Sequence, residues 1–275
     1  MHVIRRLQPD DAAACFALST TRGWKTSEAK WRTMIDLGTA YGIHVGGDLE
    51  GAVILTRFGT TLASIAMMVV SPEHGRRGLG RALMERTLDD AGDVTVFLYA
   101  SDMGQSLYSR LGFVVAGVSV RLDGQVRATF PTYPGLRPMR PDDLPLVIAL
   151  DEEAQGAQRG RLLELLFREA DRACVVQRDG AVVGFGLSSV FLSYRVSSPI
   201  VARDDDTARV IASALAANES ALVRFDLAPG ERALRVWAEA AGLAVTGTRT
   251  LMVRGRLSLP GNRGLVRALA SRAYG

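Results

Sequence analysis

A glycine-rich turn with three arginines is the segment whose residue types point most directly to chemistry. It follows an apolar stretch and carries Gly78 and Gly80 at the start of an amphipathic helical pattern. The beginning of a helix exposes free N–H groups and a partial positive charge, so acidic side chains are usual there. Arg76, Arg77 and Arg81 are found instead. A bound polyanion would compensate these cations, because N–H groups hold phosphate oxygens and arginines pair with them.

The glycine pattern also bears on other kinds of site. A Gly-x-Gly pair alone is weak evidence, and an ordinary turn with solvated arginines explains it as well. No Lys-Ser or Lys-Thr follows the glycines, which argues against a nucleotide triphosphatase loop. A Gly-x-Gly-x-x-Gly pattern with a later ribose-binding acid is missing from the sequence, which argues against a dinucleotide site.

A second segment, residues 105–113, reads Gln-Ser-Leu-Tyr-Ser-Arg-Leu-Gly-Phe. Its pattern predicts a short helix that ends at Gly112. Tyr108 lies in this helix, where its phenol could face the end of the sheet; a half-buried packing role is the alternative. One expected helix and one expected strand separate the two segments.

The turn, the Leu-Tyr-x-x-Leu-Gly-Phe segment and their spacing resemble the GNAT superfamily of acyl-CoA-dependent N-acyltransferases. The cofactor motif of that family is Arg/Gln-x-x-Gly-x-Gly/Ala after a strand, and Gly75 stands here at its first position. The resemblance implies acetyl-CoA as co-substrate and Tyr108 as the general acid toward the departing thiolate. It also implies acetyl-CoA contacts at Met68, Val69, Val70, Gly75, Arg76, Arg77, Gly78, Leu79, Gly80 and Arg81.

The resemblance further implies an N-acetyltransferase in which a neutral primary amine attacks the acetyl carbonyl directly. A backbone N–H near Met68 would polarise that carbonyl. Residues 62–70 contain no Asp, Glu or His, so no general base is assigned; water relayed to Glu28 or Asp36 is one route. A small-molecule amine, a peptide N-terminus and a protein lysine all remain as acceptors. The side chains expected at the acceptor site are those of Trp24, Glu28 and Trp31.

Core packing of both tryptophans is the alternative to that acceptor role. A non-catalytic acyl-CoA-binding sensor is the alternative to the enzyme, and it would share the turn but show no turnover. A nucleic-acid-binding regulator is suggested only by the positive net charge, and it predicts steeply salt-dependent DNA binding.

The chain repeats itself at a spacing of nearly half its length. Residues 4–11 (IRRLQPDD) recur as residues 136–143 (LRPMRPDD), and two shorter matches follow at almost the same spacing. Such ordered matches argue for a duplicated domain. We expect a GNAT-like domain with the acetyl-CoA site at 1–130 and a divergent GNAT-like domain at 136–275. The repeated segment opens a helix in each copy, with Asp10 and Asp142 as the expected N-caps.

The second copy lacks the phosphate-binding pattern. Arg209 and Ile211 stand where the first copy has its two glycines, and three aspartates, residues 204–206, precede them. Acids cap a helix well but repel a pyrophosphate. Trp237 takes the place of Tyr108 and has no hydroxyl proton to donate. We therefore expect no CoA in this half; a cryptic second CoA site is the alternative.

Each half predicts an α/β fold built on a mixed, mostly antiparallel sheet flanked by helices. A strand, two helices and a tight-turned strand pair come first, and strands then alternate with helices. A final helix is expected over residues 263–273.

Composition and charge exclude several classes of protein. Of 275 residues, 48% are hydrophobic and two are cysteines, which excludes a disordered chain and a disulfide scaffold. No apolar run is long enough for a membrane span and no signal-peptide core is visible, so we expect no membrane partner and a cytoplasmic protein. The net charge of +4 comes from interleaved acids and bases, which argues against a nucleic-acid partner. No His/Cys cluster predicts a metal site.

Overall fold

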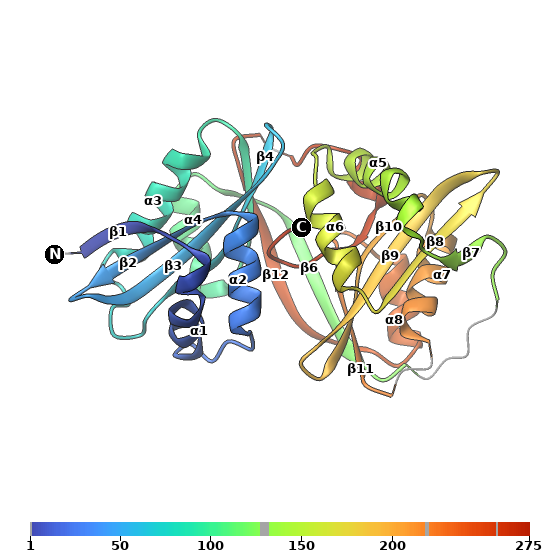
Figure 1. The fold of residues 1–275 in the computed structure, drawn as a ribbon, viewed down its shortest axis with the longest axis horizontal. Coiled ribbons are helices and arrows are strands. Elements are labelled where there is room, and N and C mark those ends of the chain that lie inside the picture. Colours follow the sequence, from blue (N-terminus) through green and yellow to red (C-terminus); the bar gives the residue numbers. More distant parts are fainter. Residues whose placement is uncertain (1, 127–131, 218–219, 257) are drawn as a thin grey trace.

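The computed structural model describes residues 2–126, 132–217, 220–256 and 258–275, which form two lobes side by side (Figure 1). The expected boundary at residues 129–135 lies partly outside the described residues. The first sequence half contains β1 (His2–Leu7), α1 (Ala12–Thr20), α2 (Glu28–Leu37), β2 (Thr39–Val45), β3 (Asp48–Phe58), β4 (Leu62–Val70), α3 (Leu79–Ala91), β5 (Thr95–Ala100), α4 (Asp102–Arg110) and β6 (Val114–Gly124).

The second sequence half repeats this succession of elements and adds one short strand at the end. It contains β7 (Leu136–Pro138), α5 (Leu144–Gln155), α6 (Gly160–Glu169), β8 (Arg172–Arg178), β9 (Ala181–Phe191), β10 (Tyr194–Ala202), α7 (Asp205–Ala216), β11 (Leu222–Leu227), α8 (Ala233–Ala240), β12 (Ala244–Arg254) and β13 (Val266–Ala268). Among the described residues, no helix is long and apolar enough to cross a membrane.

The strands of the described residues all join one mixed sheet of 13 strands. The strand order is β1-β2-β3-β4-β5-β12-β6-β11-β13-β10-β9-β8-β7. Most neighbours are antiparallel, and the parallel pairs are β4 with β5 and β10 with β11. The predicted α/β class with a mostly antiparallel sheet flanked by helices is confirmed.

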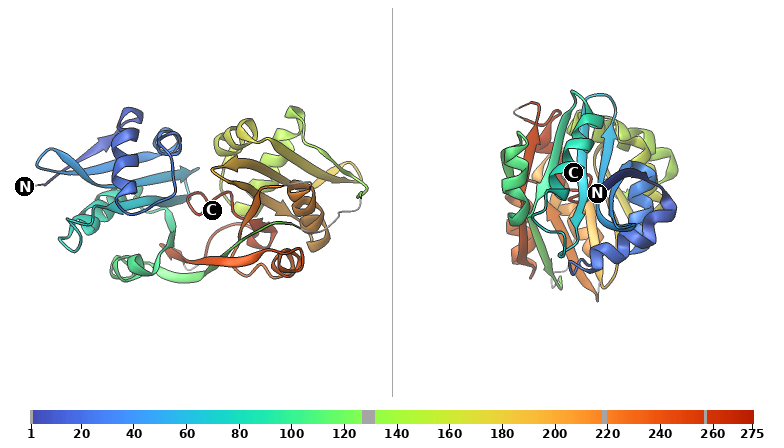
Figure 2. Two further views of the ribbon diagram at one scale, coloured as in Figure 1. Left: turned by 90° about the horizontal axis from the view of Figure 1, so that it is seen from below. Right: turned by 90° about the vertical axis from the view of Figure 1, so that its left-hand side faces the viewer.

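The two sequence halves exchange one strand each. β12 pairs with β5 of the first half, and β6 pairs with β11 of the second half. The two exchanged strands also pair with each other over most of their length. In the left view of Figure 2 they run side by side along the lower edge of the molecule and connect the two lobes. Each half therefore completes the sheet of the other half.

Helices cover both faces of the sheet in the first lobe. Alternate residues of β3 point to opposite faces, as strand geometry requires. Ile54 packs into the apolar cluster under α1 and α2, which contains Trp31, and Leu55 packs into the cluster under α3, which contains Leu83. Because α3 packs on this face and follows β4 in the chain, its start lies above the sheet near the end of β4.

The repeated segment makes the same contact in both halves. Arg5 pairs with Asp11 at 2.6 Å, and Arg137 pairs with Asp143 at 2.7 Å. Each of these aspartates also accepts a backbone N–H three residues earlier in the chain. The expected N-caps Asp10 and Asp142 are wrong by one residue, because a short 3-10 turn precedes each helix and places the next carboxylate at the cap.

The helix expected over residues 263–273 is wrong. A 3-10 turn covers Arg263–Leu265 and the strand β13 follows. β13 pairs with both β10 and β11. As a strand it satisfies backbone N–H and C=O groups on these two neighbours, which a helix in its place would leave without hydrogen bonds. Long-range pairing therefore decides the conformation of a short apolar run.

Candidate functional site

The turn between β4 and α3 forms an open helix start. Gly78 is the N-cap of α3 and has φ +84°, which glycine adopts without strain. No described atom lies within 4 Å of the place that a Cβ on Gly78 would take. Among the described residues, no side chain caps this end, and the first turn of α3 contains no acid. Its N–H groups can therefore face an anion.

The three predicted arginines differ in their contacts. Arg76 and Arg77 are exposed, and within the described part of the chain neither has a carboxylate at ion-pair distance. Arg81 instead pairs with Glu85 one helical turn later, at 2.7 Å. Arg76 also has φ +61°, an uncommon conformation for a residue with a side chain. Two cations thus remain unpaired beside the helix start.

Polar contacts fasten the turn to the strands beneath it. The Glu50 carboxylate lies 3.0 Å from Nδ1 of His74, and its backbone oxygen accepts the N–H of Ser71 at 2.8 Å. Arg22, in the turn after α1, donates to the carbonyl oxygens of Val70 at 2.7 Å and Ser71 at 3.2 Å. Sequence reasoning missed Arg22, since no pattern links it to a strand so far along the chain.

β4 bends just before the turn. Ala52 pairs with Val69 and Ile54 with Ala66, so two residues of β4 oppose one residue of β3. Met67 sits in this bulge with φ +54°. Such a bulge re-aims the backbone of the bulged strand. The sequence carries no sign of it, because no glycine marks the position.

β4 and β5 separate before this bulge is reached. Their parallel pairing joins residues 62–64 to residues 95–97 and then stops. Among the described residues, the edge of β4 that faces β5 consequently has no strand partner over residues 65–70. Met68 and Val69, predicted to contact the arm of acetyl-CoA, lie on this open stretch. Val70 lies there too, but its carbonyl oxygen is bound by Arg22.

Tyr108 lies on α4 in the apolar cluster that also contains Leu79 at the start of α3. Its side chain is 9% exposed, and its ring packs edge-on against Phe113 with centroids 6.1 Å apart. Burial raises the pKa of Tyr108 to about 12, so the phenol keeps its proton at neutral pH. α4 is held in turn by the second half, because Gln105 donates to Oγ1 of Thr250 on β12 at 3.1 Å.

The three residues predicted for acceptor binding do not form one surface. Trp31 is completely buried in the core, and its indole N–H donates to Oγ of Ser19 at 3.1 Å. Packing, the alternative weighed for both tryptophans, therefore describes Trp31. Trp24 is 37% exposed, and Glu28 pairs with Arg32 on the surface of α2 at 3.1 Å.

The start of α7, the equivalent helix of the second half, is closed by its own side chains. Asp204 accepts the N–H of Thr207 at 2.7 Å and pairs with Arg178 at 2.6 Å. Trp237, in the place of Tyr108, packs edge-on against Phe225 at 5.9 Å. Among the described residues, no group of three or more His, Cys, Asp or Glu side chains could hold a metal ion.

The strand opening of the second half is also filled. β10 and β11 pair in parallel only over residues 194–196 and 222–224, as β4 and β5 do at their own start. β13 then enters between them and pairs with Ile200 on one side and Leu227 on the other. The second half therefore occupies its opening with a segment of the same chain.

Sequence comparison decides the family. Acetyltransferase (GNAT) domains match residues 37–115 and residues 147–267. The chain is 30% identical over 232 residues to the uncharacterized N-acetyltransferase YitH of Bacillus subtilis (strain 168), a match that covers 81% of this chain and 80% of YitH. The chain belongs to the GNAT acetyltransferase family. It is a tandem member, since each half matches a GNAT domain.

Solved GNAT structures have the same fold. A putative acetyltransferase from Pyrococcus horikoshii superimposes with a TM-score of 0.83 at 19% identity, over 100% of this chain and 96% of that one. A tandem GNAT protein from the clavulanic acid biosynthesis pathway superimposes with a TM-score of 0.69 at 16% identity, over 94% of this chain and 100% of that one. At these identities the likeness concerns the fold.

Proposed function

We propose that this GNAT protein is an acyl-CoA-dependent N-acetyltransferase that moves the acetyl group of acetyl-CoA to a primary amine. The observation that carries the proposal is the open edge of β4 over residues 65–70, which leads directly into the uncapped start of α3. The extended arm of acetyl-CoA can form hydrogen bonds with the strand edge, while the pyrophosphate of the same molecule binds the N–H groups at the helix start. Arg76 and Arg77 supply unpaired positive charge at that end.

The chemical step is direct transfer. The amine nitrogen attacks the thioester carbonyl carbon, the carbon–sulfur bond breaks, and the amine loses a proton. A backbone N–H near Met68 polarises the carbonyl, because the bulge at Met67 turns the β4 backbone there. Tyr108 supplies the proton that the departing thiolate takes up. β4 contains no Asp, Glu or His, and no side chain is assigned as the general base, so the amine proton passes through water to solvent. Solvent then returns a proton to Tyr108.

We further propose one acetyl-CoA site per chain, in the first half. Two contacts in the second half support this. Asp204 caps α7, so its first N–H groups are less available and a carboxylate faces any phosphate. β13 occupies the opening between β10 and β11. The second half then serves as a scaffold that completes the sheet and holds α4.

Calorimetric titration with acetyl-CoA tests both proposals. We expect wild type to bind close to one equivalent and Gly78→Glu to lose binding at least ~10-fold, because the new carboxylate stands where phosphate would lie. Gly180→Glu is the matched control: Gly180 has φ +79° and equally open surroundings, but it lies in the β8–β9 turn. Equal losses in both variants would contradict the assigned site, and two equivalents would contradict the single site.

Turnover separates the enzyme from a sensor. Release of free CoA thiol is followed with wild type, acetyl-CoA and a panel of small primary amines and peptides. Stoichiometric binding with amine-dependent thiol release supports the acetyltransferase. Stoichiometric binding without thiol release from any amine supports the non-catalytic acyl-CoA-binding alternative.

A further inference from the structure

A cavity of ~240 Å³ lies where the exchanged strands meet the C-terminal segment. Its walls are largely apolar and include Leu251 of β12, Val266 of β13 and Leu259. Two polar side chains, Ser258 and Arg263, also line it. A mainly apolar cavity with a few polar groups is the usual form of a small-molecule site.

Arg263 is a partly buried cation without a counter-charge. Its guanidinium donates to Oε1 of Gln155, a neutral acceptor. Among the described residues, no carboxylate lies within ion-pair distance of it. Burial, together with the nearby Arg159, lowers the pKa of Arg263 to about 10. Burying an arginine in this way is costly unless an anion accompanies it.

Two further polar groups next to Arg263 lack partners. The hydroxyl of Tyr99 and Nε2 of Gln155 are both buried and, in the described part of the chain, neither has a hydrogen-bond partner. Tyr99 faces Leu251, a cavity residue, across the β5–β12 pair. Buried donors without acceptors are uncommon in folded proteins and call for an explanation.

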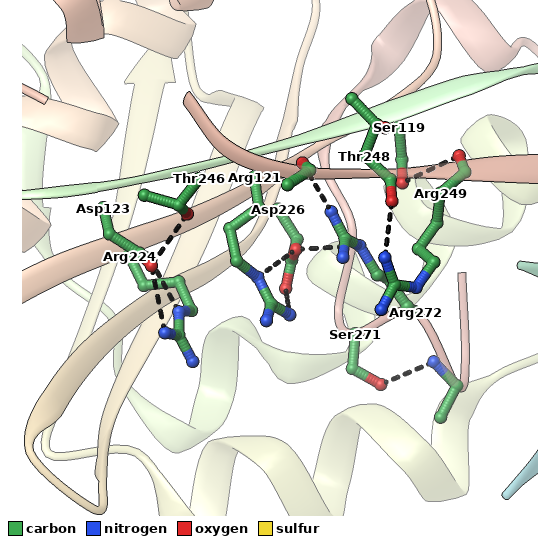
Figure 3. A network of polar contacts seen from close by, with 12 residues as sticks. Ser119, Arg121, Asp123, Arg224, Asp226, Thr246, Thr248, Arg249, Ser271 and Arg272 are labelled. Carbon is green, nitrogen blue, oxygen red and sulfur yellow. Dashed lines mark hydrogen bonds and ion pairs between the residues drawn. The ribbon is translucent and has the colours of Figure 1, made fainter. Parts of the chain in front are cut away.

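Nearby carboxylates cannot supply the missing negative charge, because other arginines occupy them. Both oxygens of Asp151 accept from Arg159, at 2.7 and 2.9 Å. Asp226 accepts two hydrogen bonds from Arg121 at 2.9 Å and also lies 3.1 Å from Nε of Arg272 (Figure 3). The network of Figure 3 thus adds positive charge to the region instead of neutralising Arg263.

We propose that this cavity binds the carboxylate of the acceptor, so that the substrate is a small amine that also carries a carboxylate. This inference rests on the proposed function. Arg263, which lines the cavity, donates to the carboxylate oxygens, and the apolar wall receives an aliphatic side chain. Leu251, another cavity residue, pairs with Tyr99 on the part of β5 that is not paired with β4, which places the cavity next to the strand that borders the open edge.

The first experiment needs no acetyl-CoA. Thermal unfolding is measured in sodium acetate, sodium phosphate and sodium chloride at equal ionic strength. We expect acetate to raise the Tm of wild type by about 2–4 °C over chloride and to leave Arg263→Met unchanged. In chloride, Arg263→Met is expected to be about as stable as wild type, because an unpaired, partly buried cation is gone. Arg263→Lys should retain part of the response.

Arg256→Met is the matched control, because Arg256 is an exposed arginine of the same segment. It should respond to acetate as wild type does. Equal responses of wild type and Arg263→Met to acetate would overturn the proposal. So would a large loss of Tm in Arg263→Met in every salt, since Arg263 would then be structural. Stabilisation by phosphate but not acetate would assign the cavity to a phosphate-bearing ligand and reject the carboxylate.

The second experiment compares L-leucine with L-leucinamide, two primary amines that differ only in the carboxylate. We expect wild type to use L-leucine with a kcat/KM at least ~10-fold higher, and Arg263→Met to lose this preference while its KM for acetyl-CoA is unchanged. Preference for the amide would overturn the inference. If neither amine is acetylated, the acetyltransferase proposal fails for this pair, and the salt experiment still decides whether the cavity binds a carboxylate.

Discussion

Ala268 of β13 pairs with Ile200 of β10, and the equivalent edge in the first half has no strand partner in the part of the chain that the structure describes. The sequence repeat aligns Val70 with Val201, so Ile200 corresponds to Val69 on the open stretch of β4. Two halves with the same succession of elements therefore differ at one place, the gap between their parallel strands. A filled gap in one half and an open gap in the other explain how a duplicated chain can keep a single site.

Ala268→Asp is expected to destabilise the protein strongly. Ala268 is completely buried, and a carboxylate placed there is removed from water. We expect the free energy of unfolding to fall by about 3 kcal/mol or more, measured by urea unfolding. Ala181→Asp, at an exposed strand position, should cost less than about 1 kcal/mol. Equal costs would mean that β13 does not pack between its neighbours.

Tyr108→Phe is expected to lower kcat by about 10²-fold and to change the KM for acetyl-CoA much less, because general acid catalysis acts on the transition state. The pKa of about 12 means that Tyr108 stays protonated up to high pH, so kcat of wild type should show no alkaline decline from this group below about pH 10. Tyr41→Phe, on β2, is the control and should keep kcat. An unchanged kcat in Tyr108→Phe would remove this residue from the mechanism.

Replacing the two tryptophans near the start of the chain should lower the free energy of unfolding by very different amounts. Trp31→Ala should lower the free energy of unfolding by about 3–5 kcal/mol, because a large buried side chain is lost. Ser19→Ala should cost about 1–3 kcal/mol, since the buried indole N–H then has no acceptor. Trp24→Ala should cost less than about 1 kcal/mol, and a raised acceptor KM would assign it to acceptor binding. Urea unfolding and steady-state kinetics make the comparison; a small loss in Trp31→Ala would contradict its core position.

Asp143→Asn should reveal a pH-dependent part of the stability. The Arg137 guanidinium lowers the pKa of Asp143 to about 2, below its unfolded value near 3.9. The stabilisation is therefore complete above about pH 4 and is lost as the pH falls through 2. At pH 7 we expect a loss of about 1–2 kcal/mol in the variant, because partial exposure of Arg137 screens the pair. The amide still accepts the N–H of Arg140.

Asp11→Asn tests the equivalent pair of the first half. Arg5 is more exposed than Arg137, so the loss should be smaller. Unfolding curves of both variants and wild type are compared at pH 7, pH 3 and pH 2. A difference between Asp143→Asn and wild type that stays constant down to pH 2 would argue against the assigned ion pair.

Local patterns in the sequence were sufficient for much of the fold. The repeat at residues 4–11 and 136–143 predicts two similar halves, and both halves have the same succession of elements. The glycines of the turn predict the open start of α3, since only local backbone geometry is needed to place Gly78. The three aspartates before Arg209 likewise predict the capped start of α7, because a cap is formed by neighbours in the chain.

Only the tertiary structure determined which strands lie together. β6 and β12 have similar patterns, and nothing in either sequence tells which half each strand joins, because hydrogen bonding between strands is the same for every partner. Residues 266–268 form a strand since two strand edges are free to pair with them. Arg263 becomes a partly buried cation for the same reason: its environment comes from segments far apart in the chain. The sequence by itself determined the elements and the turn, and long-range pairing decided the exchange, the filled gap and the cavity.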